Sequence, residues 1–284
     1  MSMPSTTPES LSGACSGSHG VTMPTPGAAP PGEREKVLRM AAHAGDLLLR
    51  CGAETYRAEE TISRICSAYG FRSEPFALPT GIFASISGDG PPLSIVRRIK
   101  SRSFNLGCVA QVNAFAREVV LSPPNLDEGL ARLAAIEKTG AYRKRHVFIS
   151  YTLTAAIFTL LYMGTPIDAA GALVIGMLLA ILRQAFSRLS PFPFFENFTG
   201  GLVAGFFTLL GTRFVQDMNV YVVVTGALIN LMPGTALVNG VRDMLGGDSV
   251  SGIARLGEAI VSVGIMAAGA ALGMGMLSAV WPVP

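Results

Sequence analysis

Residues 220–238 read VYVVVTGALINLMPGTALV, an uncharged run of 19 residues that contains Asn230 and the pair Pro233-Gly234. A helix needs about 20 apolar residues, at roughly 1.5 Å each, to span a membrane, so this run has the length of a transmembrane helix. Proline removes a helical hydrogen bond and its ring clashes with the preceding turn, while the glycine beside it adds backbone freedom. We therefore predict a transmembrane helix that is broken near Pro233.

Four other apolar runs lie in the same half of the chain, and each carries at most one charged residue. The helices of a large soluble core would each show a polar face, and these runs do not. We therefore predict an α-helical membrane domain over residues 143–284. Its five transmembrane helices are expected near residues 147–163, 167–182, 193–211, 220–238 and 256–280.

Charged residues make up only 14% of the 284 residues, against roughly 25% in an average soluble domain. Residues 1–146 hold 17 Lys and Arg and 13 Asp and Glu, whereas residues 147–284 hold five and six. This asymmetry is typical of a soluble part followed by a membrane domain. Because the basic residues are interleaved with acidic ones, we expect no nucleic-acid partner.

The remaining half of the chain is predicted to contain a small α+β domain over residues 33–142. Amphipathic and alternating patterns distinguish its helices from its strands. The expected helices cover residues 33–50, 54–69, 106–120 and 126–139, and the expected strands cover residues 73–78, 81–87 and 94–100, with a turn at 88–92. Residues 1–32 are rich in Pro, Gly, Ser and Thr and carry one charge, so we expect a disordered tail there.

Flanking basic residues indicate the orientation. Arg143, Lys144 and Arg145 directly precede the first apolar run, and four more arginines (183, 188, 242 and 255) fall on the same side of a five-helix model. The opposite side receives only Arg213. By the positive-inside rule the α+β domain is cytoplasmic, the C-terminus is extracytoplasmic, and Trp281 lies at the lipid interface. We expect a multi-pass protein of the inner (plasma) membrane, in contact with lipid.

The broken helix is the first candidate site. Non-helical backbone at membrane depth is tolerated where it lines a cavity, and transporters bind substrates and ions at such breaks. The expected substrate-binding residues are Asn230, Pro233, Gly234, Thr235 and Asn239. In an intact helix Asn239 would lie a half-turn from Asn230, so the break must reorient Asn239 if both amides face one cavity.

Charged residues inside or beside the apolar runs are the second set of candidates. Glu196 and Asp168 are candidates for proton coupling, because an ionisable group within a membrane is costly and usually functional. Either could instead be an acid that favours a helix N-terminus. A third set of charged residues is expected to have structural or gating roles and to form ion pairs with one another. They are Arg242, Asp243, Asp248, Arg255 and Glu258. Glu258 is expected to pair with Arg255, three residues before it.

An enzyme is a weaker interpretation. Glu54, Glu59 and Glu60 could form an acid/base cluster, although acids at helical spacing more often form a solvated face. A sensing membrane subunit is a third alternative. The chain contains no GxSxG, HExxH, P-loop or dinucleotide motif. Its four cysteines form no CxxC pair. We therefore expect no enzymatic activity, no cofactor, no metal and free thiols.

Three segments resemble the threonine/serine exporter family. They are residues 52–70 (GAETYRAEETISRICSAYG), residues 78–81 (LPTG) with Asn113 in a Gln-Val-Asn, and residues 231–258 (LMPGTALVNGVRDMLGGDSVSGIARLGE). The resemblance implies a secondary transporter that exports threonine or serine by proton antiport, or alternatively a dicarboxylate such as succinate. It also implies a two-part organisation, in which this larger part works with a second membrane subunit of about four or five spans.

Small residues in the apolar runs suggest close helix contacts. The positions concerned are Gly171, Gly176, Gly200, Gly201 and Gly205. We expect them to support an oligomer or a complex with a second membrane protein.

Overall fold

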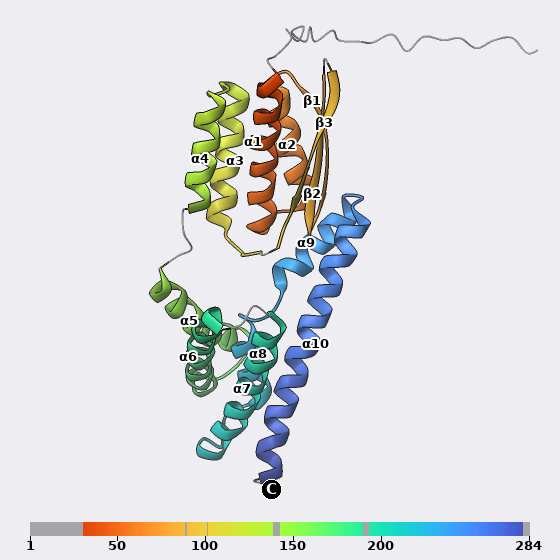
Figure 1. Ribbon diagram of the computed structural model, residues 1–284. Coiled ribbons are helices and arrows are strands. Elements are labelled where there is room, and N and C mark those ends of the chain that lie inside the picture. The colour runs from red at the N-terminus through yellow and green to blue at the C-terminus, as the bar shows by residue number, and fades with distance from the viewer. Residues whose placement is uncertain (1–30, 89, 101, 139–142, 190–192, 281–284) are drawn as a thin grey trace, which may run out of the picture.

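The computed structural model describes residues 31–88, 90–100, 102–138, 143–189 and 193–280. Helices and strands of the first half stack above a bundle of helices from the second half (Figure 1). The tail over residues 1–30, the end of the fourth expected helix at residue 139 and Trp281 lie outside the described residues. The first helix starts at Pro31 rather than after residue 32, because proline is favoured in the first turn of a helix.

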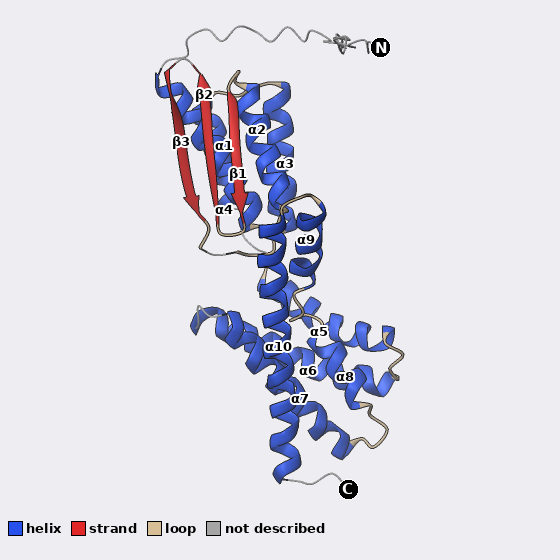
Figure 2. Ribbon diagram, turned by 90° about the vertical axis from the view of Figure 1, so that its right-hand side faces the viewer, coloured by secondary structure: helices blue, strands red, loops and turns tan. Residues whose placement is uncertain are grey.

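The first half forms a three-stranded antiparallel sheet with four helices on one side. Its elements are α1 (Pro31–Arg50), α2 (Thr55–Ala68), β1 (Arg72–Leu78), β2 (Gly81–Gly88), β3 (Gly90–Arg98), α3 (Leu106–Leu121) and α4 (Leu126–Lys138). The strand order is β1-β2-β3, and Phe83 of β2 lies opposite Phe76 and Val96. Helices α1 and α2 cover one face of the sheet, and Figure 2 shows the other face without a covering helix.

The elements match the sequence-based expectation to within a few residues, except at the second hairpin. A turn was expected over residues 88–92, whereas β3 already begins at Gly90 and includes Pro91 and Pro92. Strand β3 is an edge strand, so it can contain prolines that lack the N–H needed in a central ladder.

The second half consists of helices of unequal length. They are α5 (Lys144–Leu161), α6 (Pro166–Leu189), α7 (Pro193–Phe214), α8 (Val220–Leu228), α9 (Gly234–Leu245) and α10 (Ser249–Val280). Among the described residues, two stretches are long and apolar enough to cross a membrane, Pro166–Phe186 and Ser249–Val280, and Arg145–Leu161 is a shorter apolar helix. Five membrane crossings therefore remain a prediction.

The break expected near Pro233 is present, but it divides the run more completely than a kink would. Helix α8 ends at Leu228 and α9 begins at Gly234, with Pro233 as its N-terminal flanking residue. The nine residues of α8 extend about 14 Å at roughly 1.5 Å each, which is less than the ~30 Å of a bilayer core. The continuous span expected over 220–238 is thus replaced by two helices, and α9 lies between the bundle and the sheet (Figure 1).

Glycines let α7 and α10 cross with their backbones in contact. A Cβ at Gly201 or Gly205 of α7 would overlap the backbone carbonyl of Met266 or Ala270 of α10. The other three glycines expected at an interface with another molecule also face this chain's own side chains, those of Met218, Ala155 and Leu231. These five glycines therefore pack the bundle of this chain itself. A residue without a side chain is needed at these positions because neighbouring helices approach the Cα atoms so closely.

We predict opposite effects of one substitution at two glycines. Gly205→Ala should lower the free energy of unfolding by about 1–3 kcal/mol, because the methyl group forces α7 from α10. Gly264→Ala, on the open side of α10 with no heavy atom within 4 Å of the added Cβ, should raise it by up to about 1 kcal/mol through helix propensity. Thermal unfolding of the detergent-solubilised protein measures both. A midpoint that rises equally for the two variants would contradict the close crossing.

Candidate functional site

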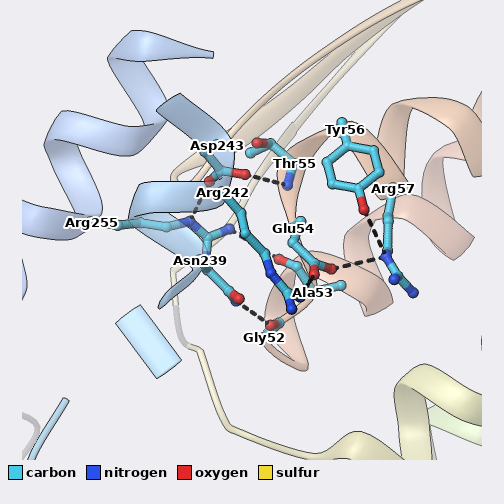
Figure 3. A network of polar contacts seen from close by, with 10 residues as sticks. All are labelled: Gly52, Ala53, Glu54, Thr55, Tyr56, Arg57, Asn239, Arg242, Asp243 and Arg255. Atoms are coloured by element: carbon cyan, nitrogen blue, oxygen red, sulfur yellow. Dashed lines mark hydrogen bonds and ion pairs between the residues drawn. The ribbon is translucent and has the colours of Figure 1, made fainter. Parts of the chain in front are cut away.

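The start of α2 meets α9 and the beginning of α10 in a polar junction (Figure 3). Gly52, with φ of +93°, turns the chain after α1, and Glu54 precedes α2 with an extended backbone. The first N–H groups of a helix have no partner within it. One is satisfied from the other half of the chain, because Thr55 N donates to Asp243 Oδ1 at 3.4 Å, and Thr55 Oγ1 also donates to Asp248 Oδ2 at 3.2 Å.

A buried ion pair lies at the centre of this junction. Arg255 Nε is 2.9 Å from Asp243 Oδ2, and the two side chains are 6% and 0% exposed. Arg255 Nη2 also donates to the carbonyl oxygen of Ala53 at 3.0 Å. Helices α9 and α10 therefore present a carboxylate and a guanidinium to the same short loop of the first half.

A second, more exposed set of contacts surrounds Glu54. Arg242 Nη1 donates to Glu54 Oε1 at 2.7 Å, and Arg57 Nε lies 3.1 Å from Glu54 Oε2. Asn239 Nδ2 donates to the carbonyl oxygen of Gly52 at 2.9 Å. Burial by itself raises the pKa of Glu54, but a hydrogen bond from its own backbone amide and the two arginines hold that pKa below its ordinary value. The carboxylate is therefore ionised at neutral pH.

These residues enclose a cavity of about 370 Å³ between the two halves of the chain. A cavity of this size lies in the range typical of small-molecule sites. It is lined by Gly52, Ala53, Glu54, Arg57, Phe104, Leu106, Val109, Gly234, Thr235, Val238, Asn239 and Arg242. The lining thus presents charged groups, an amide and a hydroxyl to the space inside.

The structure separates the residues expected to bind substrate. Gly234, Thr235 and Asn239 line the cavity. Asn230 instead donates from Nδ2 to the carbonyl oxygen of Tyr151 at 2.9 Å, and the Tyr151 hydroxyl donates back to the carbonyl oxygen of Asn230 at 3.3 Å. The two amides therefore face different surroundings, because the break directs α9 out of the bundle and onto the first half.

Asn230 belongs to a second polar cluster, inside the bundle. The guanidinium of Arg183 lies 5.2 Å from the centre of the Tyr151 ring, and its Nε is 3.7 Å from Glu196 Oε1. Glu196 lies in a different helix from the break, but a series of contacts through Arg183 and Tyr151 connects it to Asn230 at the break.

Asp168 occupies a helix-start position with its carboxylate fully engaged. Its Oδ2 accepts from the Thr165 amide at 2.8 Å and the Thr165 hydroxyl at 2.9 Å. Its Oδ1 accepts from the amide of Asn219 at 2.7 Å, which joins the start of α6 to the start of α8. This geometry corresponds to the capping alternative considered for this residue.

Four of the five expected gating residues contact the start of α2 or the loop before it: Arg242, Asp243, Asp248 and Arg255. The expectation of an ion pair between Glu258 and Arg255 is wrong. Glu258 pairs with Arg102 at 3.1 Å and not with Arg255, whose guanidinium turns toward Asp243. Arg57, Arg102 and Arg183 are not among the site residues expected from the sequence. Arg102 and Arg183 have partners that are distant in the sequence or lie in another helix, whereas Arg57 pairs locally with Glu54, and only the docking of α9 brings it to the cavity.

The three carboxylates of the possible enzyme cluster have separate partners. Glu54 lies in the junction, Glu59 Oε1 accepts from the amide of Ala77 at 2.7 Å, and Glu60 pairs with Arg64 at 2.7 Å. The three carboxylates therefore do not form the acid/base cluster considered from the sequence.

Among the described residues, two apolar helices of membrane-spanning length follow an α+β part, which is the composition of a membrane protein. The chain belongs to the threonine/serine exporter family. The model of that family, described as "Putative threonine/serine exporter", matches residues 39–277. This is a family of exporters and not of enzymes.

Two curated relatives are similar to the chain. The "Threonine/serine exporter" of Corynebacterium glutamicum is 23% identical over 253 residues, covering 84% of this chain and 50% of the relative. The "Probable threonine/serine exporter" of Mycobacterium tuberculosis (strain ATCC 25618 / H37Rv) is 22% identical over 234 residues, covering 79% and 43%. The chain therefore spans about half the length of these relatives, and no solved structure matches it.

We predict that the buried pair dominates the stability of the junction. Asp243→Asn should lower the free energy of unfolding by about 3–5 kcal/mol, because it leaves Arg255 buried without a counter-charge. Glu258→Gln removes an ion pair whose side chains are 35% and 44% exposed, and should cost no more than about 1 kcal/mol. Denaturant unfolding in detergent compares the two variants. Equal effects would show that the Asp243–Arg255 pair does not hold the junction.

Proposed function

We propose that the chain is a subunit of a secondary transporter that exports threonine and serine from the cell by proton antiport. The carrying observation is the cavity at the junction, where the first turn of α9 meets the Gly52–Arg57 loop. Membership of an exporter family and two relatives with exporter names support the transport class. A helix that breaks beside a charged cavity supports substrate binding at this place.

The proposed arrangement places residues 33–142 in the cytoplasm and residues 143–284 in the inner membrane. Basic residues concentrated on one side of the apolar helices support this orientation. The cavity then opens on the cytoplasmic side, where an exporter collects its substrate. The C-terminus lies on the opposite side.

Proton coupling is assigned in this proposal to Glu196 rather than to Asp168. Glu196 pairs with Arg183, which in turn contacts Tyr151 beside the break. Protonation of Glu196 would release Arg183 and so change the charge next to α8. The carboxylate of Asp168 accepts three hydrogen bonds that serve the helix start, and the proposal gives it a structural role.

A second membrane subunit, of about four or five spans, completes the proposed transporter. The relatives named as exporters are about twice as long as the part of them that this chain matches. The proposal therefore includes a second subunit, and export assays use both chains.

The broken helix provides the first test of the function. Pro233→Ala should allow a continuous helix through residues 229–233, withdraw α9 from the cavity and reduce threonine export at least about tenfold. Pro166→Ala changes a proline at the start of α6, where no helical hydrogen bond is lost, and should leave export nearly normal. Export is measured in cells that co-express the second subunit, at matched membrane levels. Normal export by the Pro233 variant would exclude the break from the transport path.

Proton coupling has its own test. Glu196→Gln should retain the fold but abolish the dependence of threonine export on an imposed pH gradient, because the amide cannot exchange a proton. Glu258→Gln, outside the bundle cluster, should keep that dependence. Threonine flux in proteoliposomes that contain both subunits, with and without the gradient, measures the effect. A gradient-driven flux in the Glu196 variant equal to that of the unaltered protein would remove Glu196 from the coupling mechanism.

A further inference from the structure

We infer that Arg57 and Arg242 form a clamp for the carboxylate group of the molecule that enters the cavity, with Glu54 as the positioning residue. The inference deepens the proposed function: export of threonine and serine supplies the identity of the ligand, whereas the geometry supplies the clamp.

The two arginines come from different halves of the chain and converge on one buried carboxylate. Arg57 lies in α2 and Arg242 in α9, and both contact Glu54, at 3.1 and 2.7 Å. The Glu54 side chain is 8% exposed, whereas those of Arg57 and Arg242 are 44% and 57% exposed. Glu54 is therefore a fixed internal anchor, and both guanidinium groups lie at the accessible wall of the cavity.

The balance of charge and donors favours an added anion. Two guanidinium groups and one carboxylate leave a net charge of +1 on the triad. A guanidinium carries five N–H donors, and among the described residues the contacts of Arg57 and Arg242 use one nitrogen of each. A second carboxylate can thus bind to both arginines while Glu54 keeps its own contacts. Planar guanidinium groups match the two oxygens of a carboxylate well.

The first turn of α9 adds to the same field. Gly234 and Thr235 line the cavity, and the start of a helix carries partial positive charge. The N–H of Gly234 already donates to the carbonyl oxygen of Met232 at 2.8 Å, so the first turn contributes through its dipole. A Cβ built on Gly234 meets no heavy atom within 4 Å, so a ligand can approach the backbone there. Pro233 ends the preceding segment and thereby creates this helix start.

The clamp also gives the carboxylate a mechanical consequence. Because Arg57 and Arg242 belong to different halves of the chain, a carboxylate bound to both stabilises the closed junction. A ligand can shift a conformational equilibrium only through such a difference in affinity between states. A ligand in the cavity therefore holds α9 against the first half and, through the break, affects the position of the bundle.

Binding of three probes to the purified full chain in detergent tests the clamp. The probes are L-threonine, L-threoninamide, which lacks the carboxylate, and succinate. We expect Arg57→Gln and Arg242→Gln to weaken L-threonine binding at least about tenfold, as expected from the loss of one charge-assisted contact. The matched control, Arg64→Gln, changes an exposed arginine of the same helix that pairs with Glu60, and should leave binding unchanged. L-Threoninamide should bind weakly to every form.

Arg57 makes the decisive variant, because its contacts are with Glu54 and Tyr56 of its own segment and its loss removes no bond across the junction. Equal L-threonine affinity in Arg57→Gln and Arg64→Gln would overturn the clamp. Threoninamide binding as tight as threonine binding would overturn it too. Neither result decides the export proposal, which is tested separately by the export assay. Succinate binding that requires both arginines, without threonine binding, would support the clamp and refute the proposed substrate. Failure of all three probes to bind the unaltered protein would also overturn it.

Discussion

The buried ion pair between Asp243 and Arg255 is the constraint on which the rest of the structure depends. Two opposite charges in an apolar interior are tolerated only when each has its partner and further hydrogen bonds. Here those additional bonds go to Thr55 N and to the carbonyl oxygen of Ala53. Removing one partner therefore affects not only the pair but also the start of α2, and with it the wall of the cavity.

The position of α9 follows from the break at Pro233 and from this pair together. The break ends α8 after nine residues, and the charges on α9 give the released segment a surface to pack against. An uninterrupted helix would have carried Arg242 and Asp243 along the direction of the bundle, away from Glu54 and Thr55. The same proline thus opens the backbone and places two charged residues at the junction.

Close packing of α7 against α10 provides the rigid frame that this arrangement requires. Helix α10 extends from the junction to the far end of the bundle, and its glycines fix it against α7 by backbone contact (Figure 1). Arg255 lies in the second turn of α10. A displacement of this end of α10 therefore moves the whole helix, which is one stiff element. The exposed face of the sheet, by contrast, carries Phe76, Phe83 and Val96 without contributing to the junction.

The sequence alone determined the order of the elements, the apolar character of the second half and the break at Pro233, because these depend on local periodicity and on backbone chemistry. It also singled out charged residues between Arg242 and Arg255, which the structure places against the start of α2. Tertiary structure decided the pairing of Arg242 with Glu54, which lie 188 positions apart, and the capture of Asn230 by Tyr151. Side-chain partners across such separations depend on how the two halves dock and on how the helices of the bundle pack, and local patterns carry no information about either.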